Sequence, residues 1–240
     1  MRQITFVLLV SLLVATTVAA RPQAKFGIKA GATMANLSGD GWDTMEELDS
    51  SLTIEKKFLM GMAAGLFVEI TLGTSGVSLQ PEFLYVTKGG KGEVTRADGE
   101  TYTQKLKNEY IEVPVLIKYN FTSAGIASPF MFAGPVAAFN IASKVQNKDV
   151  PQDDPTLGDK DIENAKSLDF GLTIGVGLGL AVGPSGKLTF DLRYTIGLTN
   201  VYDDVDAADF DGHKAYLAEA DGTALDFKNN DFRFMAGYQF

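Results

Sequence analysis

The segment LDFGLTIGVGLGLAV alternates strictly between two kinds of side chain, and this alternation limits the folds open to the chain. Every even position from 168 to 182 is large and apolar, whereas every odd position between them is Asp, Thr, Ala or Gly. Successive side chains of a β-strand point to opposite faces, so the segment predicts a strand with one apolar face and one small or polar face. A helix would instead place apolar residues three or four positions apart.

The same alternation predicts seven further strands, which makes the fold class all-β. They lie in FGIKAGATM, FLMGMAAGLFVEITL, VSLQPEFLYV, YIEVPVLIKYNF, PFMFAGPVAAFNI, KLTFDLRYTIGL and DFRFMAGYQF. The strand that contains Pro135 keeps its alternation only if the phase slips near Gly134 and Pro135. Because proline has no N–H to donate to a ladder, we expect bulges or local gaps at Pro81, Pro114 and Pro135.

Short and long connections alternate between these strands. GTSG, TSAGIAS and GPSG are short and rich in turn-forming residues, whereas residues 38–57, 88–109, 143–167 and 200–231 form long connections. The long connections carry a net charge of −12, and the whole chain carries −9. We therefore expect an antiparallel up-and-down arrangement with short turns at one end and long acidic loops at the other. The acidic charge argues against a nucleic-acid partner, because a phosphate backbone requires a basic surface.

The two faces of the strands predict an eight-stranded antiparallel up-and-down transmembrane β-barrel. The interior of such a barrel is just wide enough for side chains to fill, so Phe, Leu and Tyr at most positions of one face would overfill it. These side chains should point outward into lipid, because a continuous apolar belt in water promotes aggregation. A soluble, lipocalin-like barrel with Phe170, Leu172 and Phe190 turned inward is the alternative. Aromatic residues near the strand ends resemble two interfacial girdles: Phe26, Tyr119, Phe121, Phe190, Tyr238 and Phe240 near the short turns, and Phe58, Tyr85, Phe170 and Phe232 near the long loops.

Charged residues on the small-residue face are predicted to point into the lumen. They are Lys29, Glu69, Glu82, Glu112, Lys118, Asp191, Arg193 and Arg233. Four are acidic and four are basic, so we expect them to pair and to plug the lumen. A narrow passive channel lined by the same side chains is the alternative.

The first 20 residues predict a cleaved secretory signal peptide, which leaves residues 21–240 as the barrel domain. Arg2 provides the positive start, an apolar core follows, and Val18, Ala19 and Ala20 provide the small residues before the cleavage point. The apolar core is shorter than the roughly 20 residues that a membrane-spanning helix needs. The chain has no Cys, so disulfides and thiolate metal sites are not expected.

Several segments together resemble the PorT-like family of outer-membrane β-barrels. They are FGIKAGATMANLSGD, SLQPEFLYVTKGGK, YIEVPVLIKYNF, MFAGPVAAFNIASK, LDFGLTIGVGLGL, LTFDLRYTIGLTN and FRFMAGYQF. The last of these also looks like the C-terminal signature by which outer-membrane barrels are recognised for insertion. The resemblance implies the outer membrane of a diderm bacterium, periplasmic termini and turns, and extracellular loops. The family's namesake is associated with secretion and maturation of surface proteins, but the matching segments are strands and imply the fold alone.

Two glycine-rich motifs fail the spacing tests for nucleotide binding. GVGLGL has Leu180 where the dinucleotide fingerprint requires its last Gly. GPSGKL has Ala181 and Leu188 where a phosphate loop requires a Gly and a hydroxyl. We interpret the glycines of GVGLGL as small residues that face the lumen.

Three features of the long loops have simple interpretations. DDVDAADFDG places Ala207 at the first ligand position of a calcium loop, so a solvated acidic loop is expected, whose carboxylates divalent cations could bridge to lipopolysaccharide. His213, the only histidine, has Asp209 and Asp211 nearby but no well-placed Ser, so a triad of a lipid hydrolase or acyltransferase is not favoured. Trp42 is expected to pack within its loop, with an interfacial or ligand contact as the alternative.

The sequence therefore predicts an integral outer-membrane barrel that is not an enzyme, and it assigns no catalytic, cofactor-binding or metal-binding residue. The acidic extracellular loops would serve binding, envelope assembly or surface shielding. Expected partners are outer-membrane lipid and lipopolysaccharide, with envelope or secretion-system proteins as further candidates. The chain is expected to be a monomer.

Overall fold

The computed structural model describes residues 24–48, 53–122, 125–148, 159–204 and 222–240, and these residues form ten strands and one helix. The elements are β1 (Ala24–Ser38), α2 (Gly41–Leu48), β2 (Thr53–Lys57), β3 (Leu59–Thr71), β4 (Val77–Thr95), β5 (Thr101–Asn120), β6 (Ala127–Lys148), β7 (Lys160–Asp161), β8 (Leu168–Val182), β9 (Gly186–Gly197) and β10 (Lys228–Gln239). In the described part of the chain, no helix has the length and apolar character needed to cross a membrane.

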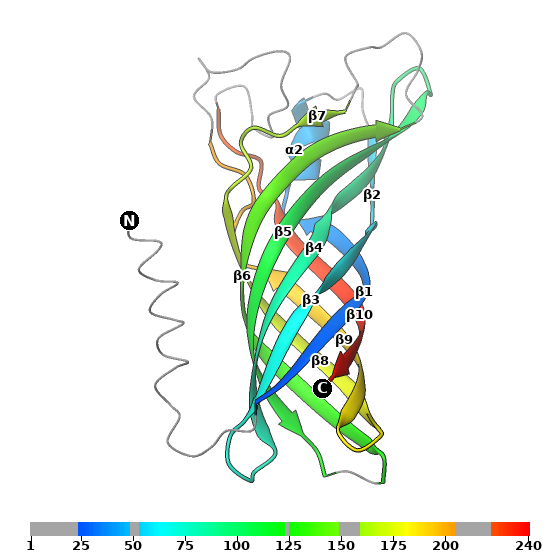
Figure 1. The fold of residues 1–240 in the computed structure, drawn as a ribbon. Coiled ribbons are helices and arrows are strands. Elements are labelled where there is room, and N and C mark those ends of the chain that lie inside the picture. The colour runs from blue at the N-terminus through cyan, green and yellow to red at the C-terminus, as the bar shows by residue number, and fades with distance from the viewer. Residues whose placement is uncertain (1–23, 49–52, 123–124, 149–158, 205–221) are drawn as a thin grey trace.

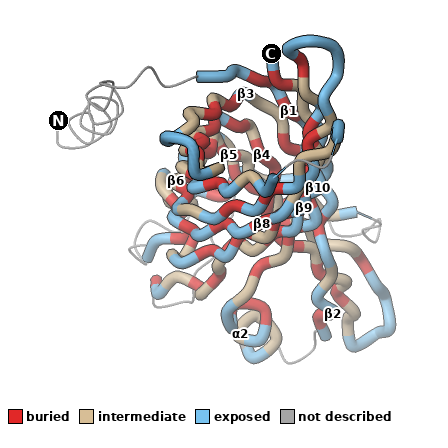
Figure 2. The backbone as a smooth tube through the Cα atoms, turned by 90° about the horizontal axis from the view of Figure 1, so that it is seen from below, coloured by how far each residue is buried: buried red, intermediate tan, exposed pale blue. Residues whose placement is uncertain are grey.

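Eight of the strands close into an antiparallel ring (Figures 1 and 2). The order around the ring is β1, β3, β4, β5, β6, β8, β9 and β10, and β10 returns to pair with β1. Gly27 lies opposite Gln239 at one end of this last pairing, and Ser38 lies opposite Lys228 at the other. The final strand therefore closes the predicted eight-stranded barrel against the first strand. Outside the ring, β2 pairs with the upper part of β4 and β7 pairs with β6.

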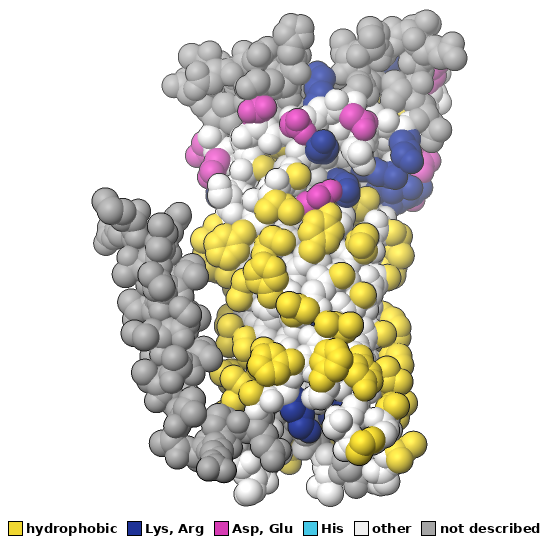
Figure 3. Space-filling view, in the orientation of Figure 1, with side chains coloured by type: hydrophobic (Ala, Val, Ile, Leu, Met, Phe, Trp, Pro, Cys, Tyr) yellow, Lys and Arg dark blue, Asp and Glu magenta, His cyan; other side chains and the backbone are white. Residues whose placement is uncertain are grey.

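The outer face of the ring carries a continuous apolar belt (Figure 3). Along β8, Phe170 is 45% exposed, Leu172 is 49% exposed and Ile174 is 58% exposed, whereas the residues between them are buried. Phe190 stacks against Phe234 of β10, which is also exposed. The apolar side chains of these strands thus point outward, as predicted, and the alternative of a soluble barrel with Phe170 and Leu172 inside is wrong.

The prolines within the strands interrupt the ladder without shifting its register. Between β4 and β5 the pairing stops at Pro81 and resumes at Leu84 in the same register. Between β5 and β6 it stops at Pro114, omits Pro135 on the opposite strand, and resumes at Ile117. The predicted local gaps are confirmed, and they follow from the missing N–H groups.

The predicted slip of β6 near Gly134 and Pro135 is wrong, because the slip lies further along the strand. The even-numbered residues of β6 face the lumen through Ala138, and the odd-numbered residues face it from Ser143. The change occurs where Tyr110 pairs with Asn140 while its neighbour Glu109 pairs with Ala142, which leaves one extra residue on β6. Such a bulge moves the following side chains to the other face. Phe130 and Phe132 lie before this bulge and share the even-numbered inner face with Val136 and Ala138, so they point inward, although large aromatics were expected outside.

The predicted long loop at residues 88–109 is instead an extended β-hairpin. β4 continues to Thr95 and β5 begins at Thr101, so only residues 96–100 form the turn. The amide of Gly99 donates to the carbonyl of Arg96, and Gly99 has a φ of 86°, which favours glycine. The hairpin continues because its alternation continues: Val94, Tyr102 and Leu106 are buried on the inner side.

Candidate functional site

Polar and charged side chains fill the lumen in three networks. The lower network, nearest the short turns, consists of Glu69, Ser78, Gln80, Lys118, Asn120 and Gln239; the middle network consists of Lys29, Glu82, Asp191 and Arg193; the upper network consists of Lys88, Glu112, Asp231 and Arg233. Within each network the cationic and carboxylate groups are equal in number. A buried charge is tolerated when it is paired and hydrogen-bonded, and this arrangement meets that condition.

The middle network joins three strands across the lumen. From β9, Arg193 donates from Nη1 to Glu82 at 2.7 Å and from Nε to Asp191 at 2.8 Å. From β1, Lys29 donates to Glu82 at 2.7 Å and to Asp191 at 3.3 Å. All four residues are buried. Because β1, β4 and β9 lie at different points of the ring, these contacts connect separate parts of the ring through the lumen.

The upper network is built around a bidentate ion pair. Arg233 of β10 donates from Nη1 and Nη2 to the two carboxylate oxygens of Glu112 on β5, at 2.6 and 3.0 Å. Arg233 also bonds to Asp231, and Lys88 of β4 lies 2.5 Å from Glu112 and 3.4 Å from Asp231. The planar guanidinium matches a carboxylate in this fork geometry, which makes such pairs strong and directional.

The lower network is connected to the middle network through one amide side chain. Glu69 accepts hydrogen bonds from Lys118 at 3.0 Å and from Gln239 at 2.9 Å. The amide oxygen of Gln80 accepts from Lys118 at 3.1 Å, while its amide nitrogen donates to Glu82 at 2.7 Å. The polar contacts therefore run continuously from the turn end to the middle of the barrel.

Two inward aromatic rings occupy space that two glycines leave open. A Cβ atom placed on Gly175 would lie 2.3 Å from Phe132, and one placed on Gly177 would lie 2.3 Å from Phe130. The ammonium of Lys118 lies 4.1 Å from the centroid of the Phe130 ring, and the guanidinium of Arg193 lies 4.9 Å from that of Phe132. These are cation–π distances. The glycines of GVGLGL are thus lumen-facing, as predicted.

All of the charged residues predicted on the inner face are buried there: Lys29, Glu69, Glu82, Glu112, Lys118, Asp191, Arg193 and Arg233. Sequence reasoning missed Lys88, which it placed at the start of a loop. Lys88 has the same even-numbered parity as Gln80 and Glu82, so the inner-face pattern of β4, followed further, would have identified it. The error arose from the strand boundary and not from the alternation.

Above the upper network, apolar side chains fill the barrel and form what we call the apolar cap. Its members are Leu37, Trp42, Ile54, Val94, Tyr102, Leu106, Val145, Ile162, Val201, Tyr202, Leu225 and Phe227. Trp42 of α2 is 1% exposed and meets Phe227 edge to face, with 5.4 Å between ring centroids. Gly92 of β4 provides room for the indole, because a Cβ there would lie 3.1 Å from it. The predicted packing role of Trp42 is confirmed.

The apolar cap also encloses a buried phenol. Tyr202 is completely buried, and its hydroxyl accepts a hydrogen bond from Asn108 at 3.4 Å. Burial raises the pKa of the Tyr202 hydroxyl above its ordinary value, so this group stays neutral. A neutral, buried tyrosine contributes packing and offers no base at physiological pH.

The apolar and the charged side chains change sides of the barrel wall between the apolar belt and the loop end. Within the belt, apolar side chains face out and charges face in. At the apolar cap the inner side is apolar, and the outer side of the β4–β5 hairpin carries Lys91, Glu93, Lys105 and Lys107. Figure 3 shows Lys, Arg, Asp and Glu side chains gathered above the apolar belt. This pattern indicates that the barrel leaves the lipid at this level and continues as a stem with a water-soluble exterior.

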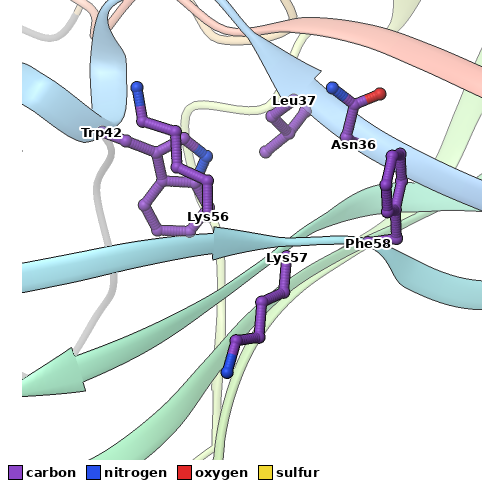
Figure 4. A pocket seen from close by; sticks show the side chains of 6 residues that line it. All are labelled: Asn36, Leu37, Trp42, Lys56, Lys57 and Phe58. Atoms are coloured by element: carbon purple, nitrogen blue, oxygen red, sulfur yellow. The ribbon is translucent and has the colours of Figure 1, made fainter.

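A small open pocket lies at the side of the stem (Figure 4). It is lined by Asn36, Leu37, Trp42, Lys56, Lys57 and Phe58 and has a volume of about 110 Å³. Lys56 extends beside the Trp42 indole and pairs with Asp43 at 2.7 Å. Ligand sites for small organic molecules are usually about 300–1,000 Å³, so this pocket is smaller than such a site.

Other predicted features lie outside the described residues. They are the signal peptide of residues 1–20, the acidic loop with Ala207, and the histidine His213 with Asp209 and Asp211. Among the described residues, no group of three or more His, Asp or Glu side chains is arranged to hold a metal ion.

Comparison with known proteins bears on the fold. A family model described as "Outer membrane protein beta-barrel domain" matches residues 20–203. Among curated proteins, none matches the chain in sequence. The neisserial surface protein A structure is similar at 14% identity, covering 90% of this chain and 97% of that chain with a TM-score of 0.45. OprG from Pseudomonas aeruginosa is similar at 9% identity, covering 91% and 97% with a TM-score of 0.42. Such distant likenesses carry no argument about function.

Proposed function

The chain belongs to the family of outer-membrane proteins with a β-barrel domain, and from that premise we propose that it is a closed, non-enzymatic barrel whose role lies at its loop end. The observation that carries the proposal is the filled interior. Three ion-paired networks occupy the lumen within the belt, and the apolar cap closes the barrel above them. The stem would then hold the acidic long loops at a fixed height above the membrane.

The filled lumen favours a plug over a narrow passive channel. A conducting pore requires a continuous file of water, but Glu82, Glu112 and Arg233 are each at most 3% exposed. Glu112 and Arg233 pair with each other across the ring, and Glu82 pairs with Lys29. Opening such a path would separate buried ion pairs, which is costly. We therefore propose that the networks stabilise the barrel and do not transport ions.

The orientation, the processing and the finer family assignment are part of the proposal. We infer cleavage of a signal peptide after Ala20, periplasmic termini and turns, extracellular loops, and membership of the PorT-like subgroup. β1 begins and β10 ends at the same end as the short turns, which supports a common side for both termini (Figure 1). The proposed partners are lipopolysaccharide and an envelope or secretion-system protein, and the proposed state is a monomer.

Two measurements on purified protein test the closed barrel. A folded barrel should run faster on an unboiled gel than after boiling, and it should fractionate with membranes. In planar bilayers the folded protein should give no steady conductance. A protein that is soluble without detergent, or that conducts steadily in its folded form, would refute the proposal.

Orientation and role need intact cells. Protease added outside should cut within the long connections at residues 143–167 or 200–231 and leave the short turns uncut. Chemical crosslinking in cells, followed by identification of the bound proteins, would then reveal the partner. A His213→Ala variant should behave like the wild type in both assays and in lipid hydrolase or acyltransferase assays, and an activity lost in this variant would contradict the non-enzymatic assignment.

A further inference from the structure

The buried charges of the barrel do not balance. Among the described residues, five buried side chains are cationic and six are anionic. The cations are Lys29, Lys88, Lys118, Arg193 and Arg233, and the anions are Glu69, Glu82, Glu112, Asp169, Asp191 and Asp231. The three lumen networks contain five cations and five of these carboxylates, so Asp169 is the one carboxylate without a matching cation.

Asp169 is held by neutral hydrogen-bond donors. It lies near the start of β8 and is 2% exposed. The hydroxyl of Thr199 donates to Oδ1 at 2.6 Å, and the amide nitrogen of Asn229 donates to Oδ2 at 3.1 Å. In the described part of the chain no ion pair includes Asp169. Lys88 acts on it electrostatically, but the Lys88 ammonium lies 2.5 Å from Glu112. The hydrogen bonds lower the cost of burying the Asp169 charge and leave the charge itself uncompensated.

An amide oxygen beside Asp169 has no donor. Asn229 of β10 is completely buried, and its amide nitrogen donates to Asp169 and to the hydroxyl of Tyr110 at 3.0 Å. Its Oδ1 meets no hydrogen-bond partner among the described residues. The carboxylate fixes this orientation of the amide, because the opposite orientation would bring two oxygens together. A buried polar atom without a partner is costly, so Oδ1 of Asn229 indicates a missing ligand.

A second such oxygen lies at the same level of the lumen. Asn108 of β5 is completely buried, and its Oδ1 also lacks a partner among the described residues. It stands two residues from Tyr110, on the same inner face of β5. Along the chain, Asn108 follows Leu106 of the apolar cap, and Asn229 follows Phe227 of the cap and precedes Asp231 of the upper network. The two oxygens therefore lie between the cap and the upper network.

Neither a water molecule nor a proton satisfies all of these groups. Water could donate to an amide oxygen, but it would leave the charge of Asp169 in place. A proton would neutralise Asp169 but would supply a single donor, so at least one amide oxygen would stay without a partner. A cation neutralises the carboxylate and is coordinated by amide oxygens at the same time.

The charge of the site selects a monovalent cation. Calcium is usually bound by several carboxylates, but the neighbouring carboxylates Glu112 and Asp231 are already paired with Arg233 and Lys88. One negative charge is balanced by one positive charge. Sodium and potassium are held in other proteins largely by neutral carbonyl oxygens, which resemble those of the Asn side chains.

We propose that Asp169 and Asn229 form a binding site for one alkali-metal cation, buried between the upper network and the apolar cap. The inference goes beyond the proposed function, because it holds whichever side of the membrane the loops face. The folded barrel binds the cation and the unfolded chain does not, so the cation stabilises the fold.

The central test is the dependence of unfolding on sodium. Wild-type protein is unfolded by urea in detergent micelles at neutral pH and constant ionic strength, with tetramethylammonium chloride replacing sodium chloride. For a Kd of about 10 mM or less, raising sodium from about 1 to about 100 mM should raise the folding equilibrium constant about ten- to a hundredfold. A change of less than about twofold would overturn the proposal.

Two conservative substitutions locate the site. Asp169→Asn removes the unbalanced charge at constant shape, so this variant should fold and lose the sodium response. Asp191→Asn is the matched control, because Asp191 is a buried carboxylate that is paired with Arg193 and Lys29. It should be less stable than the wild type at every sodium concentration and keep the wild-type sodium response. Equal responses in the wild type and in Asp169→Asn would overturn the proposal.

A third variant tests Asn229 by a gain of binding. Asn229→Asp adds a second carboxylate, so its folded fraction on unboiled gels should rise with millimolar calcium, whereas that of the wild type should not. If calcium leaves the variant unchanged, Asn229 does not face the cation and the site is refuted. A stabilisation of the wild type by calcium would overturn the monovalent assignment.

Other outcomes identify what replaces the cation. Equal stabilisation by sodium and tetramethylammonium would show general screening and refute a specific site. Stability that is independent of sodium but rises as the pH falls would assign a proton to Asp169. Independence of both, with a loss of stability in Asp169→Asn, would assign a hydrated carboxylate. Each of these results would overturn the cation site.

The conductance measurement keeps this inference distinct from the proposed function. Steady conductance together with a normal sodium response would refute the plug and leave the cation site in place. A closed barrel whose unfolding ignores sodium would refute the cation site alone.

Discussion

Replacing Glu112 by Gln tests whether the lumen is a dry plug. The substitution keeps the size of the side chain and removes one negative charge from the upper network. Glu112 is completely buried and accepts two hydrogen bonds from Arg233 as well as an ion pair from Lys88. After the change, two cations would share the single carboxylate of Asp231.

The magnitude follows from the burial of the network. Removing one partner of a buried ion pair costs about 3–5 kcal/mol, because the other charge stays buried without compensation. An exposed pair costs at most about 1 kcal/mol, because water and salt screen it. Lys166 and Asp203 form such a pair at 3.5 Å, so Lys166→Gln is the matched control. We expect Glu112→Gln to lower the free energy of unfolding by about 3–5 kcal/mol and the control to change it by less than about 1 kcal/mol.

A second substitution separates charge imbalance from lost packing. Lys88→Met removes a positive charge at nearly constant volume, so the variant with both changes leaves Arg233 paired with Asp231 and restores neutrality. We expect it to be more stable than Glu112→Gln alone by about 0.5–3 kcal/mol, the range found for coupled neighbours. If the double variant is instead less stable than Glu112→Gln by the loss that Lys88→Met causes on its own, the residues of the network are not coupled as the contacts indicate.

Urea unfolding in detergent micelles measures these differences, and the protein contains its own probe. Trp42 is the only tryptophan, and it lies in the apolar cap, so its fluorescence should shift when the barrel opens. Unboiled gels provide an independent measure of the folded fraction. A loss of less than about 1 kcal/mol for Glu112→Gln would show that water reaches the network, and it would refute the dry plug.

Other substitutions test the apolar cap, the glycines that make room for the inward aromatic rings, and the apolar belt. Trp42→Ala should lower the free energy of unfolding by about 3–5 kcal/mol in thermal or urea unfolding, whereas Phe58→Ala, at a half-exposed position, should cost clearly less. Gly177→Leu should reduce the folded fraction on unboiled gels, because its Cβ would lie 2.3 Å from Phe130; normal folding would show that this ring can move. Phe234→Arg, at the centre of β10 on the belt, should cost about 2–4 kcal/mol in vesicles, and a negligible cost would place this position outside the hydrocarbon.

The sequence predicted the membrane-embedded part of the barrel well, because there the alternation has a physical cause at every position. Lipid requires apolar residues outside and the narrow lumen requires small or paired polar residues inside, so Leu172 and Arg193 are each constrained by their face. The same rule failed at Phe130 and Phe132, which point inward. Their space depends on Gly175 and Gly177 of another strand, and a pattern within one strand cannot reveal such a contact.

The loop end was predicted less well because its apolar side chains face inward and its charged side chains face outward, the reverse of the arrangement in the membrane. Residues 88–109 are charged on one face and carry Val94, Tyr102 and Leu106 on the other, a pattern that also indicates a strand once the solvent outside is water. Taken as a connection between lipid-facing strands, this segment was predicted as a loop. The apolar cap, moreover, joins residues from five separate parts of the chain, and sequence spacing alone does not show that they meet.

The paired charges of the lumen and the apolar cap occur in one molecule because the solvent outside the barrel changes along its length. Inside the belt, lipid forces the charges of the upper network into the lumen, where only paired charges are tolerated. Above the belt, water accepts the outward charges, so the interior can become the apolar cap. Lys57 and Phe58, adjacent in sequence, mark the boundary on the outer side, and Lys88 and Gly90 mark it on the inner side. The outer and inner sides of the wall therefore change character at the same level of the barrel.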